Sequence, residues 1–294
     1  MSNSYVSRKR KYFLISFLAA FFVFWLVFLL MMSAGQTSAT PQAMSTPAPV
    51  AYQPSEQDAL TLLLIGTEYH GAVADTFLLL RYDPVRGQVG VVVFPPGTVL
   101  THNGDGETLA EAYRFGGMAY TRTALEQTLN IPIDRHARIT LPGFVAAASA
   151  VGMVEFELYE QMSIHAGGQP ITLGAGVHLL DGHQVAELIR YQGLPGGQAA
   201  RVELITRLVC AVIDQRIDVV QSTLVQQIFT TVINLLDTDI TFADFEQRIA
   251  GAKLMAQQNE PVALPVLLRG DFCENDTRFT LHDTAIAQIS RSFL

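Results

Sequence analysis

The chain has 294 residues, a formal net charge of −8, 49% hydrophobic residues and 16% charged residues. The high apolar fraction excludes a disordered or collagen-like chain, and the acidic balance argues against general nucleic-acid binding, which requires a basic face. The two cysteines, Cys210 and Cys273, are too few for a disulfide-dense scaffold or a cysteine-rich zinc site.

The N-terminal region contains a long apolar segment preceded by a basic one. Residues 12–32 carry no charge, and Arg8-Lys9-Arg10-Lys11 comes directly before them. At about 1.5 Å per residue, a helix of this length spans a hydrocarbon core of roughly 30 Å. The positive-inside rule then makes residues 1–11 a cytoplasmic tail and places everything after residue 32 outside the cell membrane. The alternative is a cleaved signal peptide, whose apolar core is usually shorter, about 7–15 residues.

The segment that follows, residues 33–57, is rich in Ser, Thr, Ala, Pro and Gln, which is typical of a flexible extracytoplasmic stalk. Residues 58–294 remain, and they are enough to bury a sizeable core. Without the four bases of the tail, 15 basic residues stand against 27 acidic ones, so this outer part carries a charge of −12. An anionic ligand therefore requires a local cluster of bases, because the overall field repels it.

The outer part contains apolar patterns of both the strand and the helix type. Strands are predicted at residues 60–67, 75–82, 89–94, 136–141, 154–159 and 262–268. Helices are predicted at residues 118–129, 144–151, 181–190, 200–215, 224–236 and 242–256. We therefore expect an α/β fold, a layered α-β-α domain with a mixed central sheet, preceded by one transmembrane helix. Residues 58–224 are expected to form its main part, and residues 225–294 to complete the same domain.

Short motifs occur in a fixed order between residues 58 and 214. They include Leu64-Ile65-Gly66-Thr67-Glu68, Ala74-Asp75-Thr76, Phe94-Pro95, Ala112-Tyr113, Asn130-Ile131-Pro132-Ile133-Asp134, Leu179-Leu180-Asp181-Gly182, Ile189-Arg190-Tyr191 and Arg201. In order, in spacing and in the anchor and stalk before them, they resemble the LytR-CpsA-Psr family. These are membrane-anchored extracytoplasmic proteins of mostly Gram-positive bacteria.

The resemblance implies transfer of a glycopolymer from a polyprenyl-pyrophosphate carrier to a cell-wall acceptor, with Mg²⁺ as cofactor. It makes Glu68 and Asp75 the metal ligands, Asp75 a catalytic residue, and Arg190 and Arg201 substrate-binding residues. Carboxylate oxygens suit Mg²⁺, and guanidinium groups suit phosphate oxygens. The alternatives are a strand-end acid and a turn-capping Asp, together with two helix-end arginines on a wet surface or paired with nearby acids such as Glu187 and Glu203.

Several basic positions of the family are neutral in this chain. Their replacements here are Val73, Pro96, Thr108, Gln192 and the pair Leu204-Ile205, and His70 stands where another arginine is frequent. Each charge-assisted contact contributes roughly 1.5–3 kcal/mol, so the loss of five weakens a pyrophosphate site by several kcal/mol. We therefore expect impaired transferase activity. The alternative is a catalytically silent envelope protein that binds a polyprenyl lipid or a protein partner, at the membrane and without nucleic acid.

The segment Ala146-Ala147-Ala148-Ser149-Ala150 places small side chains on a predicted helix. Such residues leave room for a lipid chain in the interior of the domain. They equally permit a close contact between this helix and the sheet. Both interpretations remain open at the level of sequence.

Overall fold

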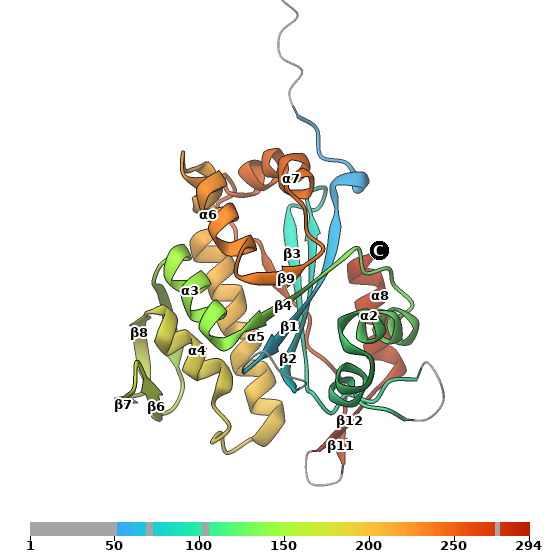
Figure 1. Ribbon diagram of the computed structural model, residues 1–294, viewed down its shortest axis with the longest axis vertical. Helices are drawn as coiled ribbons and strands as arrows, with labels where there is room; N and C mark the ends of the chain where they lie inside the picture. Colours follow the sequence, from blue (N-terminus) through green and yellow to red (C-terminus); the bar gives the residue numbers. More distant parts are fainter. Residues whose placement is uncertain (1–51, 69–72, 102–105, 274–276) are drawn as a thin grey trace, which may run out of the picture. The chain divides into compact units, whose positions relative to one another are not determined.

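A six-stranded mixed sheet with the order β10-β3-β2-β1-β4-β9 forms the centre of the fold (Figure 1). The computed structural model describes residues 52–68, 73–101, 106–273 and 277–294. The strands are β1 (Leu60–Thr67), β2 (Ala74–Asp83), β3 (Gln88–Phe94), β4 (Arg135–Thr140), β9 (Leu236–Thr238) and β10 (Ala263–Pro265). The pairs β1–β4 and β10–β3 are parallel, and the other three pairs are antiparallel. The predicted α/β fold with a mixed central sheet is thus confirmed.

The predicted tail, the predicted membrane segment and most of the predicted stalk lie outside the described residues, as does His70. Residues Tyr52–Leu294 form one compact unit. Within the described residues, no helix combines the length and the apolar character needed to span a membrane. The first described residue, Tyr52, is anchored to this unit, because its hydroxyl donates a 2.8 Å hydrogen bond to Asp58 Oδ2.

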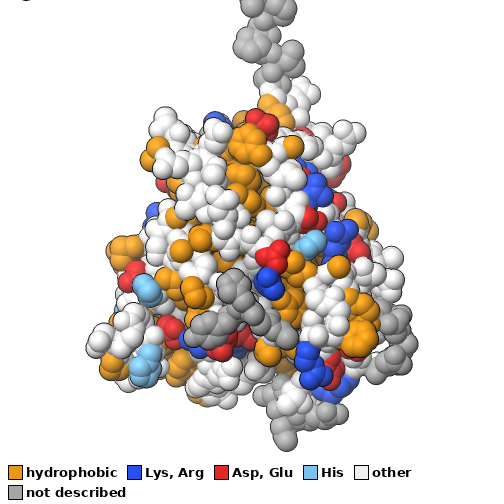
Figure 2. Space-filling view, in the orientation of Figure 1, with side chains coloured by type: hydrophobic (Ala, Val, Ile, Leu, Met, Phe, Trp, Pro, Cys, Tyr) orange, Lys and Arg blue, Asp and Glu red, His pale blue; other side chains and the backbone are white. Residues whose placement is uncertain are grey.

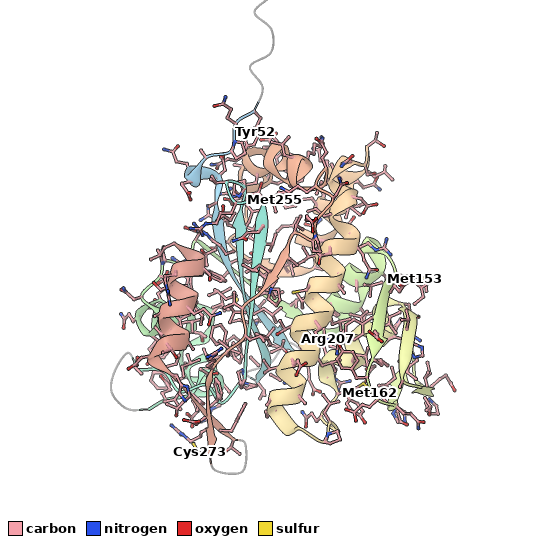
Figure 3. The ribbon with its side chains drawn as sticks, turned by 180° about the vertical axis from the view of Figure 1, so that it is seen from behind. Tyr52, Met153, Met162, Arg207, Met255 and Cys273 are labelled. Carbon is pink, nitrogen blue, oxygen red and sulfur yellow. The ribbon has the colours of Figure 1, made fainter. Side chains whose placement is uncertain are left out.

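Helices cover both faces of the sheet, as the layered pattern predicted (Figure 1). One face packs against α2 (Leu109–Leu129) and α8 (Asp283–Phe293), and side chains such as Leu63, Phe77 and Phe293 form its core. The other face is covered by α3 (Leu141–Val151), α4 (Gly182–Arg190) and α5 (Gly197–Arg216). The N-terminal Tyr52 and the end of α7 at Met255 lie at one end of the sheet, and Cys273 lies at the opposite end (Figure 3).

The burial of β1 differs between the two faces. Its apolar run predicts a strand that is fully buried on both sides, but buried and half-buried residues alternate along it. Leu63 and Ile65 are completely buried against α2 and α8. Leu64 and Gly66 point to the other face and are half-buried, because they line a cavity there. This difference places the candidate site on the α3–α5 side.

Helix α2 begins earlier than the sequence pattern predicted. A capping box between Thr108 and Glu111 starts the helix at Leu109, whereas the prediction began it at Met118. Gly117 interrupts the helix with φ 66°, a backbone conformation that glycine adopts without steric cost. The prediction therefore recognised only the half of the helix after the kink.

The helix predicted from residue 181 is confirmed as α4, and the spacing of Asp181 and Gln184, which is typical of a capping box, forms one. Asp181 Oδ1 accepts from the backbone N–H of Gln184 at 2.9 Å, and Gln184 Oε1 accepts from the backbone N–H of Asp181 at 2.9 Å. Directly after the cap, Gly182 packs so closely on α3 that a Cβ atom there would lie 2.9 Å from the backbone N of Ser149. Residues 146–150 line no part of the cavity. Ala147 is buried and Ser149 approaches Gly182 of α4, whereas Ala146 and Ala150 are exposed, so these small side chains provide no room for a lipid in this cavity.

The remaining elements surround this core. They are η1 (Glu56–Asp58), β5 (Val154–Leu158), β6 (Met162–Ala166), β7 (Gln169–Leu173), β8 (Gly176–Leu180), η2 (Ile217–Gln221), α6 (Val225–Ile233), α7 (Phe242–Met255), β11 (Gly270–Cys273) and β12 (Arg278–Leu281). The pairs β5–β8, β6–β7 and β11–β12 form separate two-stranded sheets. On the face seen in Figure 2, the described acidic and basic side chains are interspersed and do not form a broad basic surface.

Candidate functional site

An apolar cavity of about 210 Å³ lies between the sheet and helices α3, α4 and α5. Its floor comes from β1, β2 and β4, and its roof from the three helices. The apolar lining includes Leu64, Leu78, Ile139, Phe144, Ile205 and Val209. Such a space accepts a hydrocarbon segment without leaving polar groups unpaired.

Polar side chains gather at one end of this cavity. Glu68, Asp75 and Arg190 all contribute to its lining. Glu68 follows the last residue of β1, Asp75 is the second residue of β2, and Arg190 ends α4. The pairing register shifts between Gly66 and Thr67, where the two strands separate into their connecting loop. The structure therefore brings three of the four sequence-predicted site residues to one charged mouth.

Arg190 is held by two carboxylates. Its Nη2 donates to Glu68 Oε1 at 2.7 Å, and its Nη1 donates to Glu187 Oε1 at 3.1 Å. The hydrogen bond to Glu68 is the largest cause that raises the pKa of Arg190. The side chains of Arg190 and Glu68 are 35% and 53% exposed, so their pair is worth at most about 1 kcal/mol. An incoming phosphate can displace such a carboxylate from the guanidinium.

Arg201 lies beside this mouth and is almost completely buried, with 3% of its surface exposed. Its Nη1 donates to the main-chain oxygen of Asp75 at 3.2 Å, and its Nε donates to the main-chain oxygen of Ile189 at 3.2 Å. Burial lowers the pKa of Arg201, and the charge of Asp75 opposes that effect. Among the described residues, no carboxylate lies within 4.0 Å of this guanidinium, so Arg201 is neither on a wet surface nor ion-paired with Glu203.

A second pocket, of about 420 Å³, lies on the other side of Arg201. It is lined by Pro95, Pro96, Gly97, Thr108, Ala110, Gln192, Gly197, Gln198, Arg201 and Thr277. Three of the neutral replacements noted in the sequence, Pro96, Thr108 and Gln192, thus meet around Arg201, although they are far apart along the chain. Among the described residues of this lining, Arg201 carries the single charge. We call this space the Arg201 pocket.

The N-terminus of α5 contributes to the Arg201 pocket through Gly197 and Gln198. A helix N-terminus carries a partial positive charge and favours anions. The other replaced positions lie elsewhere: Leu204 and Ile205 are buried in the core, and Val73 is 72% exposed. The Arg201 pocket therefore retains one guanidinium and one helix dipole for an anion.

Glu68 and Asp75 are the residues that fit a divalent cation. One Glu68 oxygen accepts from Arg190, and Asp75 Oδ1 accepts from the Thr76 hydroxyl at 2.9 Å. Within the described part of the chain, no group of three His, Cys, Asp or Glu residues is arranged for a metal. Mg²⁺ is commonly held by one or two carboxylates, with water and substrate phosphate completing its shell. Glu68 and Asp75 supply the two carboxylates of such a shell, and a substrate phosphate is needed to complete it.

The fold and the site define an α/β protein whose cavity is apolar inside and charged at its mouth, a combination suited to amphiphilic ligands. The chain belongs to the LytR_cpsA_psr family, whose model matches residues 26–292. The family predicted from the sequence motifs is confirmed.

Two curated relatives carry the name polyisoprenyl-teichoic acid–peptidoglycan teichoic acid transferase TagU. The protein of Enterococcus faecalis is 27% identical over 200 residues, which cover 65% of this chain and 64% of the relative. The protein of Halalkalibacterium halodurans is 30% identical over 114 residues, which cover 37% of this chain and 38% of the relative. The chain therefore matches less than two thirds of the length of either relative.

Solved structures share the fold. TagV of B. subtilis has a TM-score of 0.67 and 18% identity, covering 81% of this chain and 97% of TagV. A structure of TagT bound to LI-WTA has a TM-score of 0.62 and 16% identity, covering 82% of this chain and 91% of TagT. At these identities the likeness concerns the fold alone.

Proposed function

We propose that this protein is an extracytoplasmic glycopolymer transferase, which moves a glycan from a polyprenyl-pyrophosphate carrier to a cell-wall acceptor. The observation that carries the proposal is the apolar cavity that ends at Glu68, Asp75 and Arg190, with buried Arg201 beside it. Membership of the family and the transferase names of the TagU relatives support it.

In this proposal the cavity holds the first part of the polyprenyl chain, and Arg190 and Arg201 bind the pyrophosphate. Mg²⁺, held by Glu68 and Asp75, supplies neutralisation of the phosphate charge when it is bound. The acceptor hydroxyl oxygen forms a bond to the phosphorus that carries the glycan, and its proton passes to the Asp75 carboxylate. The bond from that phosphorus to the bridging oxygen breaks, and polyprenyl phosphate leaves.

We further propose that residues 12–32 anchor the chain in the cell membrane as a single span. Residues 1–11 then lie in the cytoplasm, and the unit from Tyr52 to Leu294 lies outside. The absence of charge from residues 12–32 and the four bases before them support this topology. The lipid carrier and the cell-wall acceptor are both reached from that side.

We also propose that transfer is slow compared with a site that keeps all of its arginines. Pro96, Thr108 and Gln192 leave Arg201 as the one charge among the residues that the structure describes around its pocket. The same observation favours a second candidate, a catalytically silent envelope protein that binds a polyprenyl lipid or a protein partner. The two candidates share the cavity and differ only in turnover.

The test uses the full-length chain purified in a mild detergent. Mass spectrometry of co-purified lipid is expected to detect a prenyl phosphate, and addition of a polyprenyl-pyrophosphate saccharide with Mg²⁺ is expected to release polyprenyl phosphate. Asp75→Asn should abolish that release, whereas the matched control Asp218→Asn, an exposed residue of η2 outside both pockets, should keep it. Lipid without turnover selects the silent candidate in its lipid-binding form. The absence of both lipid and turnover contradicts the transferase and the silent lipid binder, and leaves the silent protein that binds a protein partner.

A further inference from the structure

A third pocket, of about 480 Å³, lies outside the site described above and is lined only by polar and charged side chains. They are Arg269, Thr284, Gln288, Arg291 and Ser292. Four of them belong to α8, which covers the sheet face opposite to α5 (Figure 1). This pocket, named here the α8 pocket, is therefore separate from the apolar cavity.

The helical repeat of α8 accounts for the α8 pocket. Ala285, Ile289 and Phe293 recur every four residues and are buried in the core. Thr284 and Gln288 precede the first two of them by one position, so they form a neighbouring polar stripe with Arg291 and Ser292. Arg269, in the segment before β11, lines the pocket together with this stripe.

The two arginines of the α8 pocket carry uncompensated charge. Both are exposed, and no carboxylate of the described residues lies within 4.0 Å of either guanidinium. Arg291 uses its Nε for the Ala287 carbonyl oxygen at 3.1 Å, and no described partner occupies its terminal nitrogens. The nearby acid Asp271 is engaged by His282, whose Nε2 lies 2.9 Å from Asp271 Oδ2. Two guanidinium groups, two hydroxyls and an amide form a donor set for a phosphate group.

A short hairpin connects the α8 pocket to the Arg201 pocket. Arg269 precedes β11, and its carbonyl oxygen accepts from His282 N at 3.0 Å at one end of the β11–β12 pair. Thr277, at the other end, lines the Arg201 pocket. From residue 277 to residue 282 there are five steps along an antiparallel strand, which is about 17 Å. The β11–β12 pair thus has Thr277, from the lining of the Arg201 pocket, at one end and Arg269, from the lining of the α8 pocket, at the other.

We propose that Arg269 and Arg291 bind an internal phosphodiester of the glycopolymer substrate, remote from the phosphate that is bound beside Arg201. The identity of the polymer rests on the proposed function. A polymer with repeated phosphates contacts both ends of the hairpin at once, so the second contact adds affinity without new contacts at the reacting phosphorus. The α8 pocket in this way selects long, phosphate-containing polymers over neutral glycans.

The test measures binding of a fluorescent glycerol phosphate oligomer to the full-length chain in detergent by anisotropy, without lipid carrier and without turnover. Arg269→Gln with Arg291→Gln is expected to weaken binding about tenfold, because two exposed guanidinium contacts to the phosphate are lost. The control pair Arg114→Gln with Lys253→Gln removes the same charge from exposed positions that line no pocket described here. It should change the affinity less than twofold. A neutral dextran oligomer of equal length should bind equally weakly to all variants.

Two outcomes overturn the proposal. In the first, the two double variants weaken oligomer binding equally, which shows a diffuse charge effect. In the second, the Arg269→Gln, Arg291→Gln variant binds the oligomer as tightly as the parent chain. Failure of the proposed function is a different result, since it appears in the release of polyprenyl phosphate from a short lipid-linked saccharide. If that release depends on Asp75 and oligomer binding is unchanged by the Arg269 and Arg291 substitutions, the α8 pocket proposal is wrong and the proposed function is supported.

Discussion

Arg201 Nη1 donates a 3.2 Å hydrogen bond to the main-chain oxygen of Asp75, and this contact joins the first turns of α5 to the start of β2. It holds a buried cation next to the residue whose carboxylate lines the cavity mouth. The acceptor is a neutral main-chain carbonyl and not a carboxylate. This hydrogen bond therefore positions the strand without neutralising the positive charge of the guanidinium. The apolar cavity and the Arg201 pocket meet at this contact.

Replacement of Arg201 by alanine is expected to lower the free energy of unfolding by about 2–4 kcal/mol, because a buried side chain is removed and two part-buried main-chain carbonyls lose their donors. Denaturant unfolding of the full-length chain in detergent measures this loss. Arg114→Ala, at an exposed position on α2, is the matched control and should change the stability by less than about 0.5 kcal/mol. Equal stability of the two variants would show that the Arg201 contacts contribute nothing to folding.

Glu68→Gln is expected to weaken the Mg²⁺ dependence of lipid-pyrophosphate binding several-fold and to leave stability nearly unchanged. The Glu68–Arg190 pair is largely exposed, so its removal costs less than about 1 kcal/mol. Glu187→Gln is the control, because Glu187 also pairs with Arg190 but does not line the cavity. Titration with Mg²⁺ in the presence of the lipid distinguishes the two variants. An identical response of both variants contradicts a ligand role for Glu68.

Val209→Phe is expected to reduce the amount of co-purified prenyl lipid, because the larger ring occupies part of a 210 Å³ cavity. Thermal stability should be preserved or slightly raised, since the ring fills empty apolar space. Val177→Phe makes the same change on β8, where Val177 is 61% exposed, and should leave the lipid content unaltered. Quantitative mass spectrometry of extracted lipid is the measurement. Undiminished lipid in the Val209 variant would place the lipid outside the cavity.

Asp244 is expected to make stability depend on pH in the acid range. Burial opposes its ionisation, but hydrogen bonds from Arg135 and Thr241 outweigh burial and lower the pKa of Asp244 to about 2. A carboxyl group with a depressed folded-state pKa contributes stability above its unfolded pKa and loses it as the pH falls through the folded value. The stabilisation, about 2 kcal/mol, is therefore complete above about pH 5 and lost between about pH 4 and 2.

The measurement is the free energy of unfolding of the parent chain and of Asp244→Asn between pH 2 and pH 7. The difference between the two should be constant above about pH 5 and should shrink towards pH 2. Glu246→Gln, an exposed position on the same helix, is the control and should show no such convergence. A gap that persists at pH 2 would assign the effect of the substitution to packing.

The elements with a strong local signal were predicted closely. The apolar runs located β1, β2 and β3 to within one residue, and the Asp181 capping box located the start of α4. Weak local signals failed: the β6–β7 and β11–β12 hairpins and helix α8 were not predicted. Helix α8 has 11 residues, and its apolar stripe consists of only three buried residues between polar positions. Such short patterns depend on neighbouring elements for their stability.

The candidate site shows the same division. Glu68, Asp75, Arg190 and Arg201 were named from their motifs, and the structure places the first three at one cavity mouth, with Arg201 against Asp75. The Glu68–Arg190 ion pair and the burial of Arg201 had no local signal. No local signal in the sequence predicted that Pro96, Thr108 and Gln192 line one pocket, or that Arg269 and Arg291 line another.

The amino-acid pattern alone specified the α/β class, most of the described helices and half of the described strands, the family and the residue types available for phosphate and metal chemistry. Those properties follow from backbone preferences and from which side of an element is apolar, both of which act over a few neighbouring residues. The cavity, its charged mouth, the Arg201 pocket and the α8 pocket arose only from folding. Their geometry depends on strand order, register and helix packing, which bring together side chains more than 100 residues apart, such as Glu68 and Arg190.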